Sequence, residues 1–169
     1  MPGKVIGISL NNGYPGTIAR NGDEVSKTRP VKVGTSNIAY GDPVVLNSDG
    51  TIQKFEAAGT DVTFAGVAIR KVKSALTYTV QNAYYQPQEA ADILERGSVT
   101  VQCNVGSPAI GGAVYVRVAT NVAIPAGVVG GFEAAADDAN TILITDVQWG
   151  STKDSNSVAE LVILTRKNV

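Results

Sequence analysis

Short runs of alternating apolar and polar residues recur along the chain, and turn residues close most of them. The run over 113–118 alternates most clearly, with its three valines on one face and Tyr115 and Arg117 on the other. A side-chain period of two is that of a β-strand with one buried face. We therefore expect a strand here whose polar face is open to a neighbouring molecule.

A hairpin is predicted where two apolar runs flank a tight turn. Residues 43–46 lead through Asp49 and Gly50 into 51–55, and an Asp-Gly pair accommodates the positive φ of a reversal. Gly66 interrupts the next apolar run, at a position where another backbone or a bulky side chain could approach closely. Further strands are expected over 64–69, 77–80, 98–103, 131–134, 141–147 and 158–164.

The stretch 87–97 carries conflicting signals. Proline near its start, acidic residues in the first turn and glycine at its end favour a helix. However, nine residues make a marginal helix, and the alternation continues into 98–103 without a loop. We therefore expect two strands joined at Arg96 and Gly97.

The composition favours an all-β fold. The 169 residues include 23 Val, 12 Ile and 14 Thr but only 7 Leu, and branching at Cβ favours strands over helices. Eighteen glycines and seven prolines supply the tight turns that short strands require. We predict an antiparallel β-barrel or sandwich with an extended N-terminal arm and short or no helices.

Residues 1–30 differ from the remainder of the chain. They are rich in turn residues, contain little that could fill a core, and through Lys32 carry a net charge of +3, which leaves −4 for 33–169. Polar, glycine-rich ends are ordered mainly by partners. We expect an extended arm over 1–30, either a frayed tail or a segment that docks on its own or a neighbouring subunit, and a single β domain over 31–169.

Several classes of function are disfavoured. The net charge of −1 offers no basic field for nucleic acid, no apolar run is long enough for a membrane span, and no signal peptide is expected at the start. With no histidine and a single cysteine, the usual zinc sites and Ser-His or Cys-His nucleophiles cannot be assembled. We expect neither an enzyme nor a metal or cofactor site, and a soluble, unprocessed chain.

Carboxylates are the remaining candidates for chemistry. Glu89 with Asp92 could form an acid and base pair, and Asp137, Asp138 and Asp146 could meet around a divalent ion. Charged residues of β-proteins usually line solvated faces, which is the interpretation we adopt. Cys103, among valines on an expected strand, is interpreted as a core residue of unassigned role.

Aromatic residues outside the strands are better candidates for a binding surface. Tyr14, Tyr84, Tyr85 and Trp149 lie in or beside expected loops, in a chain that is only 6% aromatic. Such residues are either satellite packing or anchors that a partner buries. The predicted partner-binding residues are Tyr14, Arg20, Arg29, Tyr84, Tyr85, Tyr115 and Arg117.

Taken together, several segments resemble the capsid cement or decoration proteins of tailed bacteriophages, also described as structural cement proteins. The similarity lies in 13–20 (GYPGTIAR), 39–46 (AYGDPVVL), 64–68 (FAGVA), 92–101 (DILERGSVTV) and 112–116 (GAVYV), and departs where many relatives have Pro-Gly, here Pro87-Gln88. The resemblance implies a mostly β homotrimer that is made in the bacterial host cytoplasm and sits on the outer surface of the virion. Its implied partner is the major capsid protein, at junctions between capsid subunits.

Two other functions compete with this one. A carbohydrate- or receptor-binding β-module on a virion would use the same aromatic loops to contact a host glycan. A carboxylate-based glycosidase is disfavoured because no two acids are clearly paired in the sequence. A small body without a catalytic set, with a basic arm and aromatic loops, fits a clamp on a protein shell better than an enzyme.

Overall fold

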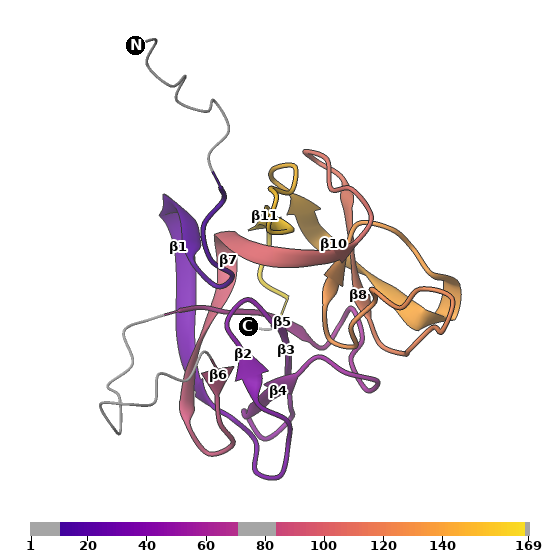
Figure 1. The fold of residues 1–169 in the computed structure, drawn as a ribbon. Helices are drawn as coiled ribbons and strands as arrows, with labels where there is room; N and C mark the ends of the chain where they lie inside the picture. Colours follow the sequence, from indigo (N-terminus) through magenta and orange to yellow (C-terminus); the bar gives the residue numbers. More distant parts are fainter. Residues whose placement is uncertain (1–10, 71–83, 168–169) are drawn as a thin grey trace, which may run out of the picture.

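The computed structural model describes residues 11–70 and 84–167, and the fold over these ranges is almost entirely β (Figure 1). The single helical element among the described residues is a 3-10 turn at Asp138–Asn140. The strand expected over 77–80 lies outside the described residues. The strands are β1 (Ile18–Pro30), β2 (Ile38–Ala39), β3 (Pro43–Leu46), β4 (Ile52–Lys54), β5 (Phe64–Ala68), β6 (Tyr84–Tyr85), β7 (Ala90–Val105), β8 (Ala113–Arg117), β9 (Phe132–Glu133), β10 (Thr141–Trp149) and β11 (Val158–Ile163).

A closed ring of strands forms one half of the molecule. In this first ring β7 pairs with β9, β9 with β8, β8 with β10, β10 with β11, and β11 returns to β7. The valines of β8 and alternate residues of β11 point inward, as the period of two predicts, whereas the alternation in β10 is shifted by one residue between Ile144 and Val147. Trp149 is fully buried in this core, so it is a packing residue and offers no surface to a partner. The expected barrel is confirmed.

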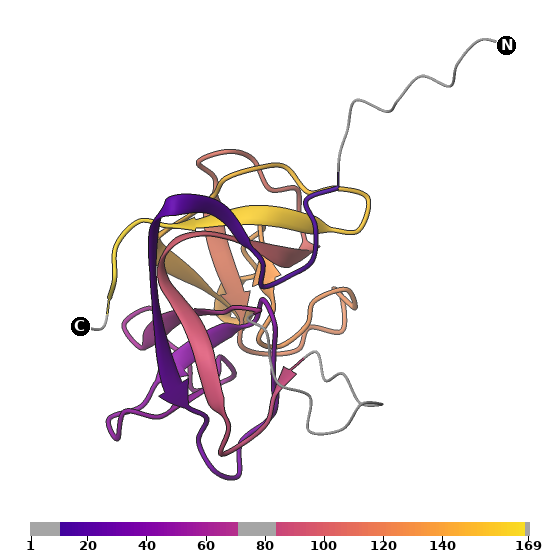
Figure 2. The ribbon, with the colours of Figure 1, turned by 90° about the vertical axis from the view of Figure 1, so that its left-hand side faces the viewer.

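A second ring is built on the first half of β7. There β7 lies between β1 and β5, β5 pairs with β3, and β3 pairs with β4. A bridge between Val31, directly after β1, and Ile52 of β4 closes the ring. A separate core of Val31, Ile38, Val44, Ile52, Ala65, Ala68, Tyr85, Ala91 and Ile93 fills it. The strand β7 is thus shared by both rings (Figures 1 and 2).

The stretch that carried helix signals is the first half of this shared strand. The two strands expected on either side of Arg96 and Gly97 are one continuous strand, β7, which bends where Gly97 adopts a φ of +118°. Two edges of main-chain hydrogen bonds and burial on both faces outweigh a weak local helix propensity. Only glycine adopts this backbone conformation without strain, which explains its position at the bend.

Residues 18–30, which were expected to belong to an extended arm separate from the β domain, pair with that domain. They form β1, which runs antiparallel to β7 from Ile18 opposite Val99 to Pro30 opposite Ala90. Figure 2 shows the two strands side by side. The pairing relies on main-chain hydrogen bonds, which the side-chain pattern does not report, and a polar sequence is typical of a strand at a sheet edge. The described part of the arm is therefore integral to the fold.

The hairpin expected over 43–55 and the close approach of another backbone expected at Gly66 are both present. Asn47–Gly50 connects β3 to β4, and the main-chain N–H of Gly50 donates to the carbonyl of Asn47. A Cβ at Gly66 would overlap the carbonyl oxygen of Leu94 in the neighbouring strand.

No helix within 11–70 or 84–167 is long and apolar enough to span a membrane.

Candidate partner-binding surface

The N-terminal strap, residues 11–17, is fixed by polar contacts to β7, to the start of β11 and to the loop before β11. The main-chain N–H of Asn12 donates to the carboxylate of Asp154 at 2.7 Å. The hydroxyl of Thr100 donates to the carbonyl of Tyr14 at 2.6 Å. These contacts hold the strap in one place without burying apolar side chains, so the residues it displays are positioned in advance for a partner.

Asp154 is the anchor for this strap. Its burial opposes ionisation, but N–H donors that include the main chain of Asn12 hold the pKa of this carboxyl below its ordinary 3.8. An ionised carboxylate accepts stronger hydrogen bonds than a neutral one. The strap is therefore held most firmly at neutral pH.

Tyr14 is displayed by the strap and is 71% exposed. The guanidinium carbon of Arg70 lies 5.7 Å from the centre of its ring, and Arg70 is itself exposed. An exposed aromatic ring beside a cation is a combination that protein interfaces favour. Tyr14 therefore remains a candidate contact.

Arg20 and Arg29 lie on β1 with acidic neighbours. Arg20 is largely exposed, and its guanidinium contacts Glu160 at 2.7 and 3.2 Å, which raises the pKa of Arg20. Arg29 is more enclosed and lies 3.6 Å from the carboxylate of Glu95. Both cations retain an accessible side, so both remain candidates.

The two tyrosines of β6 differ in their environments. Tyr85 is buried: its hydroxyl donates to the carbonyl of Ile69 at 2.8 Å, and its ring meets that of Tyr40 edge-on at 5.3 Å. This corrects the expectation that Tyr85 contacts a partner, because its ring belongs to the second core and its hydroxyl is already satisfied. Tyr84 is half-buried beside it and stays a candidate.

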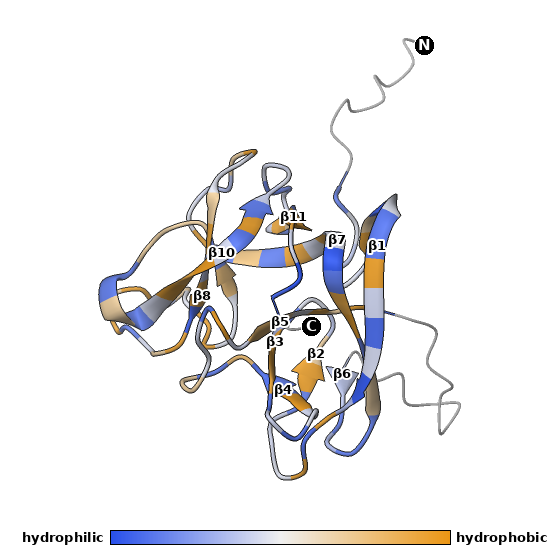
Figure 3. Ribbon diagram, turned by 180° about the vertical axis from the view of Figure 1, so that it is seen from behind, coloured by the Kyte–Doolittle hydropathy of each residue, from blue (hydrophilic) through white to orange (hydrophobic). Residues whose placement is uncertain are grey.

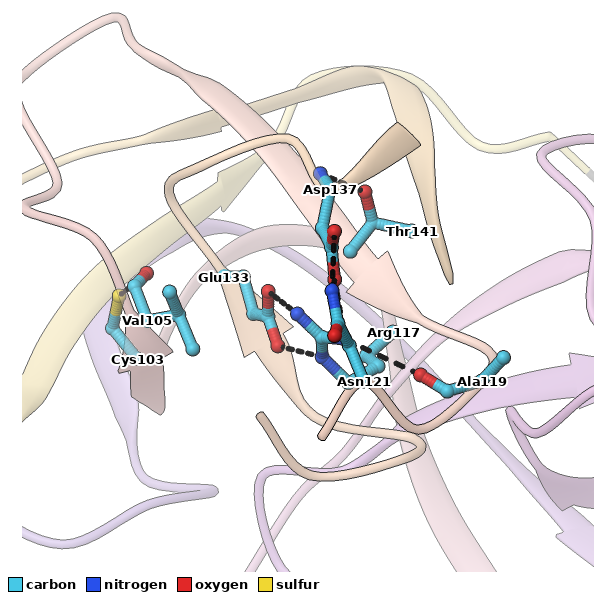
Figure 4. Close-up of polar contacts among 8 residues, drawn as sticks. All are labelled: Cys103, Val105, Arg117, Ala119, Asn121, Glu133, Asp137 and Thr141. Carbon is cyan, nitrogen blue, oxygen red and sulfur yellow. Dashed lines mark hydrogen bonds and ion pairs between the residues drawn. The ribbon is translucent and has the colours of Figure 1, made fainter. Parts of the chain in front are cut away.

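Arg117 corrects the sequence prediction most strongly. Its side chain has no exposed surface and forms two bonds to Glu133, which is also fully buried, and one to Asp137 at 2.8 Å (Figure 4). These partners raise the pKa of Arg117, and the bond from Arg117 is the main reason that the pKa of Asp137 lies below its ordinary value. The connection after β8 covers this face, and Gly127 lies directly against the guanidinium. Arg117 is therefore an internal structural residue.

Tyr115 lies on the same face of β8 but is only half-buried. It is opposite Leu143 of β10, which is exposed, and Glu133 of β9. A tyrosine beside an exposed leucine leaves a small apolar area on the outside of the first ring. Tyr115 therefore remains a candidate.

Three loops carry exposed apolar residues that the sequence analysis did not single out. Val62, Ile110 and Val122 are 75%, 80% and 97% exposed, each within a connection between strands. The available signal was a branched apolar residue inside a cluster of turn residues, where neither core nor strand explains it. Isolated exposed apolar residues are common, but on three loops they offer contact points for another surface.

The described residues offer little for catalysis. A cleft of about 230 Å³ between the strap, the β2–β3 turn and β7 contains Asp42, whose pKa is raised by burial and lowered in part by Lys54 at 3.0 Å. Burial also raises the pKa of the Cys103 thiol, which keeps it protonated and unreactive at neutral pH. Within 11–70 and 84–167 no three acidic or thiol groups converge on a metal position. The Asp137–Asp138–Asp146 site is therefore not assembled in this region, whereas the pairing of Glu89 with Asp92 stays a prediction.

Comparison with known proteins provides the identification. A chain in the solved capsid of Myoviridae Phage XM1 has the same fold, with a TM-score of 0.71 and 16% identity over 97% of this chain and 98% of that chain. No curated protein matches. The sequence matches the family of the XM1 gp53 minor capsid protein over residues 3–164. The chain therefore belongs to the XM1 gp53 minor capsid protein family and is a structural protein of a bacteriophage capsid.

Proposed function

We propose that this chain is a cement or decoration protein that binds the outer surface of the assembled head. It binds over junctions between major capsid subunits and stabilises the shell without a catalytic step. The observation that carries this proposal is the exposure of Val62, Ile110 and Val122 on separate loops of an otherwise well-packed β-fold. Burying such side chains against a flat protein surface gains about 25 cal/mol per Å².

The mechanism is mass action on subunit contacts. A protein that binds the assembled shell and not the separated subunits stabilises the shell by its own binding free energy. At a free concentration 100 times the dissociation constant, this amounts to about 2.7 kcal/mol per site. Repeated over many junctions, such a contribution resists pressure from packaged DNA.

A homotrimer is part of the proposal, because cyclic assembly places three copies of the same loops on a shell. The half-buried face with Tyr115 and the exposed Leu143 is the surface we assign to contacts between copies. Light scattering of the free protein and of protein released from heads measures the assembly directly. Monomers in both preparations would exclude the trimer.

The experiment adds purified protein to mature heads that lack it and measures copies bound and the temperature of head disruption. We expect saturable binding and a higher disruption temperature. The variants Val122→Asp and Ile110→Asp should reduce binding at least tenfold, because a charge replaces an apolar contact. Thr120→Asp, which places the same charge on an exposed residue of the loop that carries Val122, is the matched control. Equal binding by all variants would contradict the proposal.

A further inference from the structure

A buried carboxylate on β7 is surrounded by three cations from separate segments. Glu95 is 3% exposed, and its carboxylate lies 3.3 Å from the Lys27 ammonium and 3.6 Å from the Arg29 guanidinium, both on β1. Arg166, from the segment that follows β11, lies 3.8 Å away. We call Glu95, Lys27, Arg29 and Arg166 the basic cluster.

Among the described residues, the basic cluster contains more cations than carboxylates. Within 11–70 and 84–167, Glu95 is the one carboxylate within 4.0 Å of any of the three cations. The local balance is therefore three cations to one acidic side chain, and like charges this close repel one another.

Hydrogen-bonding capacity in the cluster is also unused. In the described part of the chain, none of the three cations donates a hydrogen bond, and Nε of Arg29 is buried without a partner. One lysine and two arginines carry thirteen N–H donors in total. Solvent accepts from the exposed ends of Lys27 and Arg166. Among the described residues, by contrast, the buried Nε of Arg29 has no acceptor and Oε2 of Glu95 has no donor in hydrogen-bonding geometry.

The cluster is open to another molecule. The side chains of Lys27 and Arg166 are 37% and 33% exposed, so both reach solvent while they approach Glu95. Hydrophilic stretches of β1 and β7 lie next to each other near the bend of β7 (Figure 3). An anionic group could therefore reach the cations without any change in the backbone.

We propose that the basic cluster receives an aspartate or glutamate side chain from a neighbouring subunit of the capsid. This inference rests on the proposed function and names the chemistry of one contact in it. A protein carboxylate fits better than nucleic acid, because three cations on a chain of net charge −1 do not form the extended basic stripe that a phosphate backbone requires. In this arrangement Glu95 is a competitor that holds the cations in position until the second carboxylate arrives.

This role predicts opposite effects for two substitutions in the same cluster. Arg166→Gln removes a donor to the incoming carboxylate and should weaken binding to heads about tenfold. Glu95→Gln removes the competing charge and should strengthen binding about threefold, although it removes an ion-paired group. A purely structural cluster predicts no gain in binding from Glu95→Gln.

The test measures dissociation constants on mature heads lacking the protein, at two salt concentrations, for wild type, Arg166→Gln, Lys27→Gln and Glu95→Gln. Arg96→Gln is the matched control, because Arg96 follows Glu95 and pairs with Asp23 instead. We expect weaker binding and a reduced salt dependence for Arg166→Gln and Lys27→Gln, and wild-type behaviour for Arg96→Gln.

The possible results separate failure of the proposed function from failure of the carboxylate contact. If wild type fails to bind heads, the proposed function fails and this inference falls with it. If wild type binds and Arg166→Gln and Lys27→Gln bind equally well with the same salt dependence, the inference alone is overturned. If Glu95→Gln does not fold, the two cation variants, whose folding is checked by thermal melting, carry the decision.

Discussion

Replacing Arg117 with methionine tests whether this residue is structural. The substitution keeps a long, unbranched side chain but removes the guanidinium that bonds to Glu133 and Asp137. Glu133 would then be a carboxylate with no exposed surface and, among the described residues, no cation within 4.0 Å. We therefore expect a large loss of stability in the isolated protein.

The size of the loss follows from the burial of the pair. Breaking a fully buried ion pair costs about 3–5 kcal/mol. For a chain of this length, each kcal/mol shifts the melting temperature by roughly 2–4 °C, so Arg117→Met should melt about 6–20 °C below wild type. The exposed Arg96–Asp23 pair is the comparison, since removing it should cost less than about 1 kcal/mol.

Thermal unfolding followed by circular dichroism at pH 7 measures these shifts. The double variant Arg117→Met with Glu133→Leu removes both charges and should recover most of the loss, because the uncompensated buried carboxylate is gone. Melting of Arg117→Met within 2 °C of wild type would refute the structural assignment. Unchanged melting combined with lost binding to heads would restore Arg117 as a partner contact.

The pKa of Asp137 is lower in the folded protein than in the unfolded chain, so its ionised form stabilises the fold above the unfolded pKa, and this stability is lost as the pH falls through the folded pKa. From about pH 5 downward, the unfolding free energy of wild type should therefore fall more steeply than that of Asp137→Asn. Denaturant titrations at several pH values measure the difference. Deleting residues 1–30 removes β1 from its pairing with β7 and should abolish cooperative melting or lower the midpoint by at least about 10 °C; an unchanged midpoint would mean that β1 is dispensable. Tyr14→Ala should cost about 1–3 kcal/mol of attachment to heads, whereas unchanged occupancy with lost signal on a glycan array would favour a carbohydrate-binding module.

Local patterns sufficed for elements whose stability is local. The strand over 113–118 and the Asp-Gly turn between β3 and β4 were predicted correctly, because side-chain period and turn chemistry are properties of neighbouring residues, whereas the openness of the polar face of that strand was not. β1 was missed because its partner, β7, lies some 70 residues away and holds it through the main chain. The side-chain pattern of residues 18–30 therefore does not indicate that pairing.

In the candidate site, too, features set by neighbouring residues were predicted and long-range contacts were not. Tyr115 and Arg117 do share one face of β8, as the period of two requires, but the connection that covers Arg117 and its partners Glu133 and Asp137 come from later in the chain. The basic cluster likewise joins β1, β7 and the segment after β11. Long-range ion pairs of this kind become visible only when the fold brings the segments together.

A reconstruction of the mature phage head is the most direct test of the central claim. A cement protein should give density on the outer surface, over junctions between major capsid subunits, with the loops that carry Val62, Ile110 and Val122 or the strap with Tyr14 in contact with the shell. Density confined to the inner surface or to the tail vertex, or density on the outer surface with all of these residues facing solvent, would contradict it.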